Sequence, residues 1–210
     1  MIRWTTVFID RPADRFVTTR DFWSAATATT PTPTRGAHDE FVTLLPASGD
    51  ACLRIQRTLD GSAGSHIDLH VDDVRASTAA ATGLGATVVE DRDTMVVMRS
   101  PGDLTFCLVA HDGEHERPAP VGAPGARTLV DQASIDVAPD RFERECRFWA
   151  ELTGWTLRPG PHPSTPCSND RTVSRSGSCS SGGARTMPAG RRCAISTWRA
   201  TTSRTRLPPM

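Results

Sequence analysis

The chain contains one sequence motif twice, 126 residues apart. Segment 9–16 reads IDRPADRF and segment 135–142 reads IDVAPDRF, and the pair Phe22-Trp23 returns as Phe148-Trp149. A period this long exceeds that of solenoid repeats and is typical of duplication of a whole small domain. The sequence therefore predicts two related domains.

The second copy loses its likeness to the first after about residue 160. Residues 1–160 hold 23 Asp and Glu against 16 Arg, whereas residues 161–210 hold 8 Arg and the single acidic residue Asp170. The neutral total charge therefore combines a net −7 and a net +7. A basic arm of this kind can bind nucleic acid or a membrane surface. We attribute the composition of the tail to a shift of reading frame and expect no nucleic-acid partner.

The start of the chain does not resemble a signal peptide, because four of its first 14 residues are charged. No apolar run approaches the ~18 residues that span a bilayer. Cys52, Cys107 and Cys146 stand singly within apolar patterns, as expected for buried thiols in a reducing compartment. We expect a cytoplasmic protein without a membrane partner.

Runs rich in β-branched and apolar residues predict strands at residues 5–9, 41–45, 52–58, 66–71, 87–89, 95–99 and 104–110. One helix is expected to begin near Pro12 with Asp14 as its cap, and to bury Phe22 and the neighbouring aromatic residues. A second helix begins at Asp72-Asp73 and is closed by Gly85. Each half therefore reads strand, helix and further strands.

Residues 66–71 read HIDLHV and alternate strictly. The apolar residues face one side of the predicted strand, and His66, Asp68 and His70 face the other. This spacing can place two imidazoles in one cavity. It is equally compatible with a simple polar pair of His66 and Asp68 near a sheet edge.

The element order and three motifs resemble the vicinal oxygen chelate superfamily, which includes glyoxalase I, the bleomycin-resistance proteins and the extradiol dioxygenases. The motifs are HIDLHVDDV at 66–74, GLGA at 83–86 and SPGD at 100–103. The resemblance implies an α+β fold in which paired βαβββ modules form a curved mixed sheet around a cavity, followed by a truncated second copy. The implied parts are a glyoxalase-like domain at 1–115, a Pro/Gly linker at 116–127, a partial second domain at 128–160 and a tail at 161–210.

Members of the superfamily often hold a divalent metal on the first and last strand of each module. By position, the resemblance puts His66 and Trp4 at the first-strand places, and the last-strand places near Cys107 and Arg54, with Gln56 two residues along. A guanidinium repels a divalent ion at close range. We therefore expect no family metal site and no other cofactor, with His66 the ligand if a metal binds at all.

The leading interpretation is a domain that binds a small organic molecule in its cavity. Trp4 would form a stacking wall, His66 and Gln56 would donate or accept hydrogen bonds, and Arg54 would pair with an anionic group. The candidate ligand-binding residues are Trp4, Arg54, Gln56, His66, His70 and Cys107. No catalytic residue is assigned, and whether the domain catalyses a reaction stays open. The alternatives are a metal-dependent lyase, isomerase or dioxygenase and a non-catalytic, antibiotic-sequestering protein.

The tail is interpreted as a frameshifted translation of the missing half of the second domain. With G or C at third codon positions, segment 194–203 read one base out of register can spell a near copy of HIDLHVDDV, 128 residues after the first. In the present frame the tail has few large apolar residues, so we expect it to be disordered. The partial domain would then expose an apolar helix face and a sheet edge, which predicts self-association.

Overall fold

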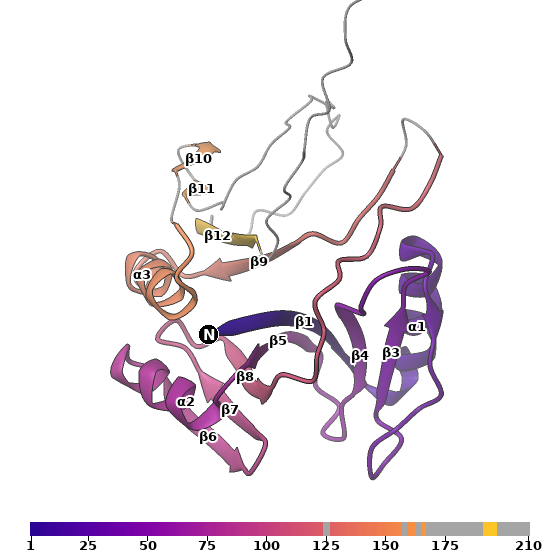
Figure 1. The fold of residues 1–210 in the computed structure, drawn as a ribbon, viewed down its shortest axis with the longest axis horizontal. Coiled ribbons are helices and arrows are strands. Elements are labelled where there is room, and N and C mark those ends of the chain that lie inside the picture. Colours follow the sequence, from indigo (N-terminus) through magenta and orange to yellow (C-terminus); the bar gives the residue numbers. More distant parts are fainter. Residues whose placement is uncertain (124–126, 157–158, 163–164, 167–190, 197–210) are drawn as a thin grey trace, which may run out of the picture.

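The computed structural model describes residues 1–123, 127–156, 159–162, 165–166 and 191–196 (Figure 1). Two modules of the predicted order, strand, helix and three strands, make up its first 110 residues. The first module comprises β1 (Ile2–Arg11), α1 (Ala13–Thr27), β2 (Thr30–Pro31), β3 (Phe41–Leu45) and β4 (Leu53–Arg57). The second comprises β5 (Gly64–Val71), α2 (Val74–Gly83), β6 (Thr87–Arg92), β7 (Met95–Arg99) and β8 (Thr105–Ala110).

The two modules share one eight-stranded mixed sheet in the order β2-β3-β4-β1-β5-β8-β7-β6. Strands β1 and β5 pair antiparallel at its centre, while β4 runs parallel to β1 and β8 parallel to β5. The sheet is curved, as Figure 1 shows, and the modules are related by an approximate twofold arrangement about the central pair. This confirms the predicted α+β fold and its curved mixed sheet.

The alternation predicted for residues 66–71 is confirmed. Ile67, Leu69 and Val71 belong to a hydrophobic core on the side of α2, together with residues of β7 and β8. A second core lies on the side of α1 and contains Phe16 and Ile55. Because side chains alternate along a strand, the polar residues of β1, β4 and β5 are left on the opposite face of the sheet.

The two helix starts differ. Asp73 caps α2, since its side chain accepts a hydrogen bond from the backbone N–H of Ala76 at 2.9 Å. The predicted Asp14 cap of α1 is wrong, because the N-cap position is Pro12 and no side chain caps the helix. The expected burial of Phe22 on α1 is also wrong, since that ring is 62% exposed.

The second copy begins with β9 (Gln132–Val137) and α3 (Phe142–Thr153). We expected the apolar face of this helix to be exposed, and that is wrong: Phe142, Phe148 and Trp149 are at most 3% exposed. They complete the core beside α2, where Phe106 of β8 meets Phe148 with 5.8 Å between ring centroids. In Figure 1, α3 lies on the same side of the molecule as α2.

Three short strands follow: β10 (Pro159–His162), β11 (Thr165–Pro166) and β12 (Arg191–Ser196). β12 pairs antiparallel with β9, which covers one edge of that strand, and β10 pairs with β11. In these pieces the tail has strands where we expected disorder. The rest of the tail lies outside the described residues. Within the part of the chain that the structure describes, no helix has the length and apolar character needed to cross a bilayer.

Candidate functional site

The polar face of the curved sheet lines a cavity of about 580 Å³. Its walls come from β1, β3 and β4 of the first module, from all four strands of the second module, and from the segment that follows β8. Five of the six residues proposed from the sequence line this cavity: Arg54, Gln56, His66, His70 and Cys107. The structure therefore gathers residues that lie up to 53 positions apart into one site.

Trp4 does not line this cavity and does not form the predicted stacking wall. Its ring is 3% exposed, and its indole N–H donates a hydrogen bond to the carbonyl oxygen of Ala51 at 3.1 Å. Phe8, four residues along β1 on the same face, supplies the aromatic surface instead. Its ring stacks on the imidazole of His66 with 4.4 Å between centroids and 12° between planes.

The imidazole of His66 lies between two carboxylates. Its Nδ1 is 2.8 Å from Asp10 Oδ2 on β1, and its Nε2 is 3.7 Å from Asp68 Oδ1 on the same strand. The contact with Asp10 exists because the antiparallel register pairs Phe8 with His66, which brings the end of β1 beside the start of β5. An Nδ1–H donated to Asp10 leaves Nε2 as an acceptor that faces Asp68 and the cavity.

Asp68 and Cys107 are buried neighbours on β5 and β8, where the parallel ladder pairs them directly. Burial raises the pKa of Asp68, against the opposing effect of His66. Burial and the adjacent Asp68 carboxylate also raise the pKa of the Cys107 thiol. Asp68 Oδ1 has no hydrogen-bond partner among the residues that the structure describes. Burying such an atom costs free energy unless a proton or a cation satisfies it.

His70 is held deeper in the site. Its Nε2 lies 2.9 Å from Thr6 Oγ1, and Thr6 is fully buried, so this hydroxyl is not an accessible nucleophile. Its Nδ1 lies 3.5 Å from Glu114 Oε2 without a well-formed hydrogen bond. Burial lowers the pKa of His70 to about 4, with Arg54 and His111 acting in the same direction and Glu114 opposing. His70 is therefore a neutral imidazole near pH 7.

Two guanidinium groups lie at one wall of the cavity. Arg54 sits over the ring of Phe8, with 5.6 Å from Cζ to the centroid, and Arg35 sits over Phe41 at 6.0 Å. Burial lowers the pKa of Arg35, and the charge of Arg54 lowers it further. Arg54 Nη2 is 4.0 Å from Glu114 Oε1, while its Nε is buried and has no hydrogen-bond partner in the described part of the chain. This wall thus carries two cations that repel each other, and the Nε–H of Arg54 is available to a hydrogen-bond acceptor.

The positions that the resemblance assigns to a metal do not fit one as a set, since they hold the Trp4 indole and the Arg54 guanidinium. A different group fits better. His66, Asp68 and Cys107 each offer one ligand atom, and these atoms all lie within 4.8 Å of one another. Nitrogen, oxygen and sulfur donors of this kind suit Zn²⁺ or a similar cation, and Asp10 would orient His66 from behind. Such an ion would supply a Lewis acid at the floor of the cavity.

Sequence reasoning missed Asp10, Phe8, Arg35 and Glu114. Phe8 and Asp10 could have been found, because they alternate with Trp4 along the same strand. Arg35 and Glu114 lie in connecting segments outside the named strands, where no periodicity indicates which way a side chain points. His66 and Asp68 were also considered as a polar pair near a sheet edge. The edge position is wrong, because β5 lies at the centre of the sheet.

Known proteins share this architecture. Residues 6–109 match the family model of the glyoxalase-like domain. The structure resembles the Mn(II)-bound glyoxalase from Novosphingobium aromaticivorans, with 14% sequence identity, a TM-score of 0.54 and coverage of 75% of this chain and 53% of that one. It also resembles 2,2',3-trihydroxybiphenyl 1,2-dioxygenase from Sphingomonas wittichii strain RW1, with 12% identity, a TM-score of 0.52 and coverage of 75% and 58%.

No curated protein sequence matches the chain. At these identities the similar structures show the fold alone, and the chain spans little more than half the length of either. The family match, the paired modules and the curved sheet agree with one another and with the motifs at 66–74 and 100–103. Residues 6–109 therefore match a glyoxalase-like domain and have the vicinal oxygen chelate fold.

Proposed function

We propose that the glyoxalase-like domain binds a small organic anion in the cavity on the polar face of its sheet. The observation that carries the proposal is the pair Arg54 and Arg35, two cations at one wall, where the buried Nε–H of Arg54 has no hydrogen-bond acceptor among the described residues. An anion between them would relieve their repulsion and accept the spare hydrogen bonds. A planar guanidinium matches the geometry of a carboxylate or phosphate.

The rest of the cavity supports a ligand that is partly aromatic or planar. Phe8 and Phe41 meet edge to face, with 6.2 Å between centroids, and form an apolar floor beneath the two arginines. Gln56 and His66 add hydrogen-bonding groups on the neighbouring strands. A few polar groups around an apolar floor are typical of small-molecule sites.

Calorimetric titration with benzoate and inorganic phosphate tests this proposal. Arg54→Gln should weaken binding roughly 10- to 100-fold, since a hydrogen bond to a charged group contributes about 1.5–3 kcal/mol. The matched control is Arg20→Gln, which alters a surface ion pair with Asp21 on α1 outside the cavity. Unchanged affinity in Arg54→Gln, or no binding of either anion, would refute the proposal. Product analysis after binding then separates a binding protein from an enzyme.

A second candidate function is a metal-dependent lyase, isomerase or dioxygenase. The unpartnered Asp68 Oδ1 beside His66 and Cys107 favours it. Titration with Co²⁺ should give one bound equivalent and a thiolate-to-cobalt absorption band, with release of the thiol proton. The band should disappear in Cys107→Ser and persist in Cys52→Ser, whose thiol lies away from the cluster. Absence of the band in the unaltered protein would exclude this candidate.

We also infer a reducing compartment such as the cytoplasm. Cys52 and Cys107 are buried and free, and Cys146 is buried as well, which supports this inference.

A further inference from the structure

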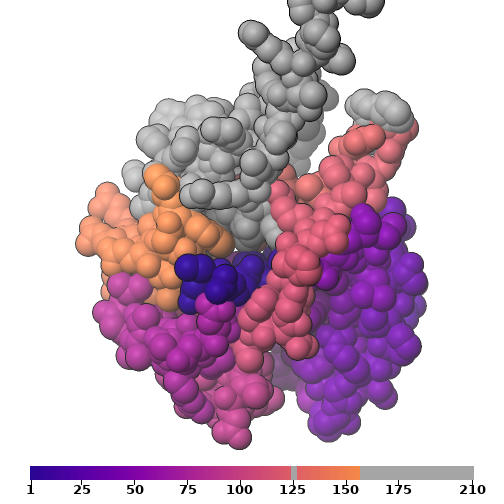
Figure 2. All heavy atoms as spheres, viewed as in Figure 1, coloured from indigo at the N-terminus to yellow at the C-terminus, as the bar shows by residue number. Residues whose placement is uncertain are grey.

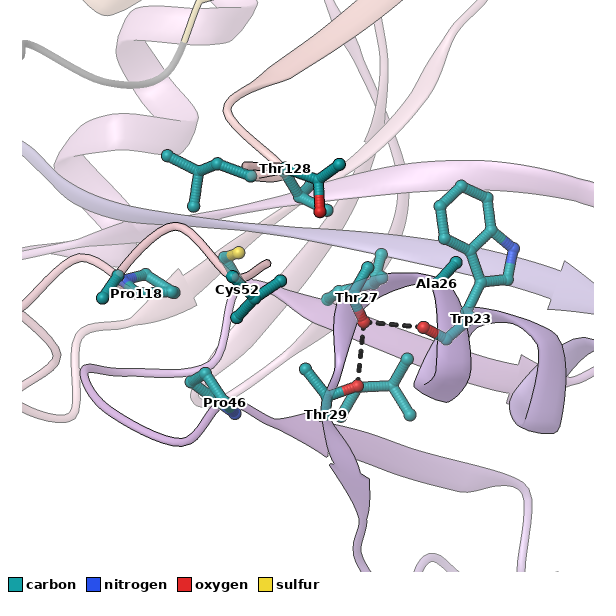
Figure 3. A pocket seen from close by; sticks show the side chains of 14 residues that line it. Trp23, Ala26, Thr27, Thr29, Pro46, Cys52, Pro118 and Thr128 are labelled. Atoms are coloured by element: carbon teal, nitrogen blue, oxygen red, sulfur yellow. Dashed lines mark hydrogen bonds between the residues drawn. The ribbon is translucent and has the colours of Figure 1, made fainter. Parts of the chain in front are cut away.

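A second cavity, of about 220 Å³, lies on the other face of the sheet (Figure 3). Side-chain alternation along β4 separates the two sites, because Leu53 lines this cavity while Arg54 lines the first. Its walls come from α1, β3, the start of β4 and residues 118–121 and 128–130. Neither the proposed function nor the family match assigns a role to it.

The lining of this cavity is almost wholly apolar. Leu44, Leu53 and Val130 form part of it, and none of the described residues that line it is charged. Thr27 Oγ1 donates to the carbonyl oxygen of Trp23 at 2.6 Å and lies 2.9 Å from Thr29 Oγ1, contacts drawn as dashed lines in Figure 3. These hydroxyls are therefore already engaged. A ligand would find apolar surface here and few spare hydrogen bonds.

Cys52 and Trp23 give the walls a preference for aromatic rings. In Figure 3 the Cys52 side chain lies near Pro118, and Trp23 lies across the cavity on α1. Burial raises the pKa of the Cys52 thiol, so it is a neutral, polarisable group. Sulfur and proline and indole surfaces all make favourable contacts with aromatic rings.

The cavity is formed in advance, because the segment that closes one side is tied down. Asp50 Oδ2 accepts the backbone N–H groups of His115 and Glu116, each at 2.8 Å. Val121 and Thr128 exchange two backbone hydrogen bonds at 2.9 and 2.8 Å. Gly49 has φ +78°, and a Cβ there would lie 2.5 Å from the carbonyl oxygen of Arg117, so this close approach needs glycine.

We propose that this cavity is a binding site for a small neutral apolar molecule of the size of a single aromatic ring, such as toluene. An engineered apolar cavity of about 150 Å³ binds benzene, so the present volume is sufficient for one substituted ring. A carboxylate would lose its hydration without gaining a cation, and is excluded from this cavity. The ligand class is thus opposite to that of the first cavity.

Methyl NMR with toluene tests the site directly. Ring currents should shift the methyl signals of Leu44, Leu53 and Val130, and leave those of Val97 and Val109 in the first cavity unchanged. Benzoate at the same concentration should leave the first group unmoved. Ala26→Phe should weaken toluene binding by at least ~10-fold, because the new ring occupies the cavity. The matched control is Ala25→Phe, the neighbouring exposed position on α1 outside the lining.

Three results would overturn the proposal: no shift in the three methyl groups, equal shifts with benzoate, or unchanged affinity in Ala26→Phe. Because Ala26 is exposed, a ring at that position should not prevent folding. The thermal transition of each variant verifies this. This test is independent of the proposed function. If benzoate shifts only the methyl signals of Val97 and Val109, the anion site is supported, whether or not toluene binds in the second cavity.

Discussion

Glu145 on α3 is fully buried and joins the second copy to the second module of the first copy. Its carboxylate accepts hydrogen bonds from Ser100 Oγ and the backbone N–H of Gly102, both at 2.5 Å, and from the Trp149 indole at 2.7 Å. Gly102 is needed for this approach, since a Cβ there would lie 2.6 Å from the carboxylate. The Glu145 side chain thus accepts the hydrogen bonds of two donors in the SPGD turn at residues 100–103.

Glu145→Ala should lower the free energy of unfolding by about 3 kcal/mol, because two buried donors and one partly buried donor lose their acceptor. Urea denaturation gives the value. Glu143→Ala, an exposed position on the same helix, serves as control and should change the free energy by less than about 0.5 kcal/mol. Equal effects of the two substitutions would mean that α3 is not docked on the turn.

Asp50 predicts a pH dependence. Hydrogen bonds from the backbone N–H groups of Glu116 and His115 lower its pKa below the ordinary value of 3.8. A depressed pKa contributes stability above the unfolded-state value and loses it as the pH falls through the folded-state value. Asp50→Asn should therefore be less stable than the unaltered protein at pH 7, and the difference should shrink at pH 3. Urea denaturation at both pH values measures it, and a constant difference would contradict the argument.

At the scale of elements, equivalent helix positions in the two copies have different surroundings. Phe22 on α1 is 62% exposed, whereas its counterpart Phe148 on α3 is 2% exposed against Phe106 and Trp149. The repeated sequence predicted one environment for both. The difference arises because α3 packs on a sheet that belongs to the first copy, as the shared core shows.

Phe148→Ala should destabilise the protein by about 3–5 kcal/mol, as expected for loss of a buried ring. Phe22→Ala removes the same atoms from an exposed site and should have an effect within about 0.5 kcal/mol. Thermal unfolding of both variants makes the comparison. A small effect of Phe148→Ala would show that α3 does not share the core in solution.

The order of the longer helices and strands, the α2 cap and the faces of β5 were predictable, because each depends on local periodicity or on residues a few positions apart. The apolar cover provided by α3 was not, since it depends on contacts between the copies. Self-association was predicted partly because the apolar face of this helix was expected to be exposed, and that reason no longer holds. Self-association itself stays a prediction, which sedimentation analysis can test.

At the scale of the whole molecule, the space-filling view shows residues 128–156 packed against the first copy, beside the start of the chain (Figure 2). The described residues thus place a strand and a helix of the second copy, β9 and α3, on the first. The frameshift hypothesis concerns the further strands that a complete second copy would have.

Sequencing the coding DNA tests that hypothesis. Read one base out of register beyond about codon 162, it should encode a second segment similar to HIDLHVDDV near positions 194–203, followed by a helix with a glycine exit. Early stop codons in that frame would refute it. A restored chain should gain apolar residues that can offset the entropy of ordering, which the present tail lacks.

The sequence by itself determined the order of the longer elements, the two faces of β5 and the likeness to the family, because these follow from local spacing and short motifs. Five of the cavity residues were also predicted, but only the tertiary structure decided which groups contact them. Asp10 meets His66, 56 residues away, through the register of β1 with β5, and Glu114 reaches Arg54 and His70 through the path of the chain after β8. Strand register and loop paths are set by the packing of the whole domain, so no local pattern in the chain specifies them.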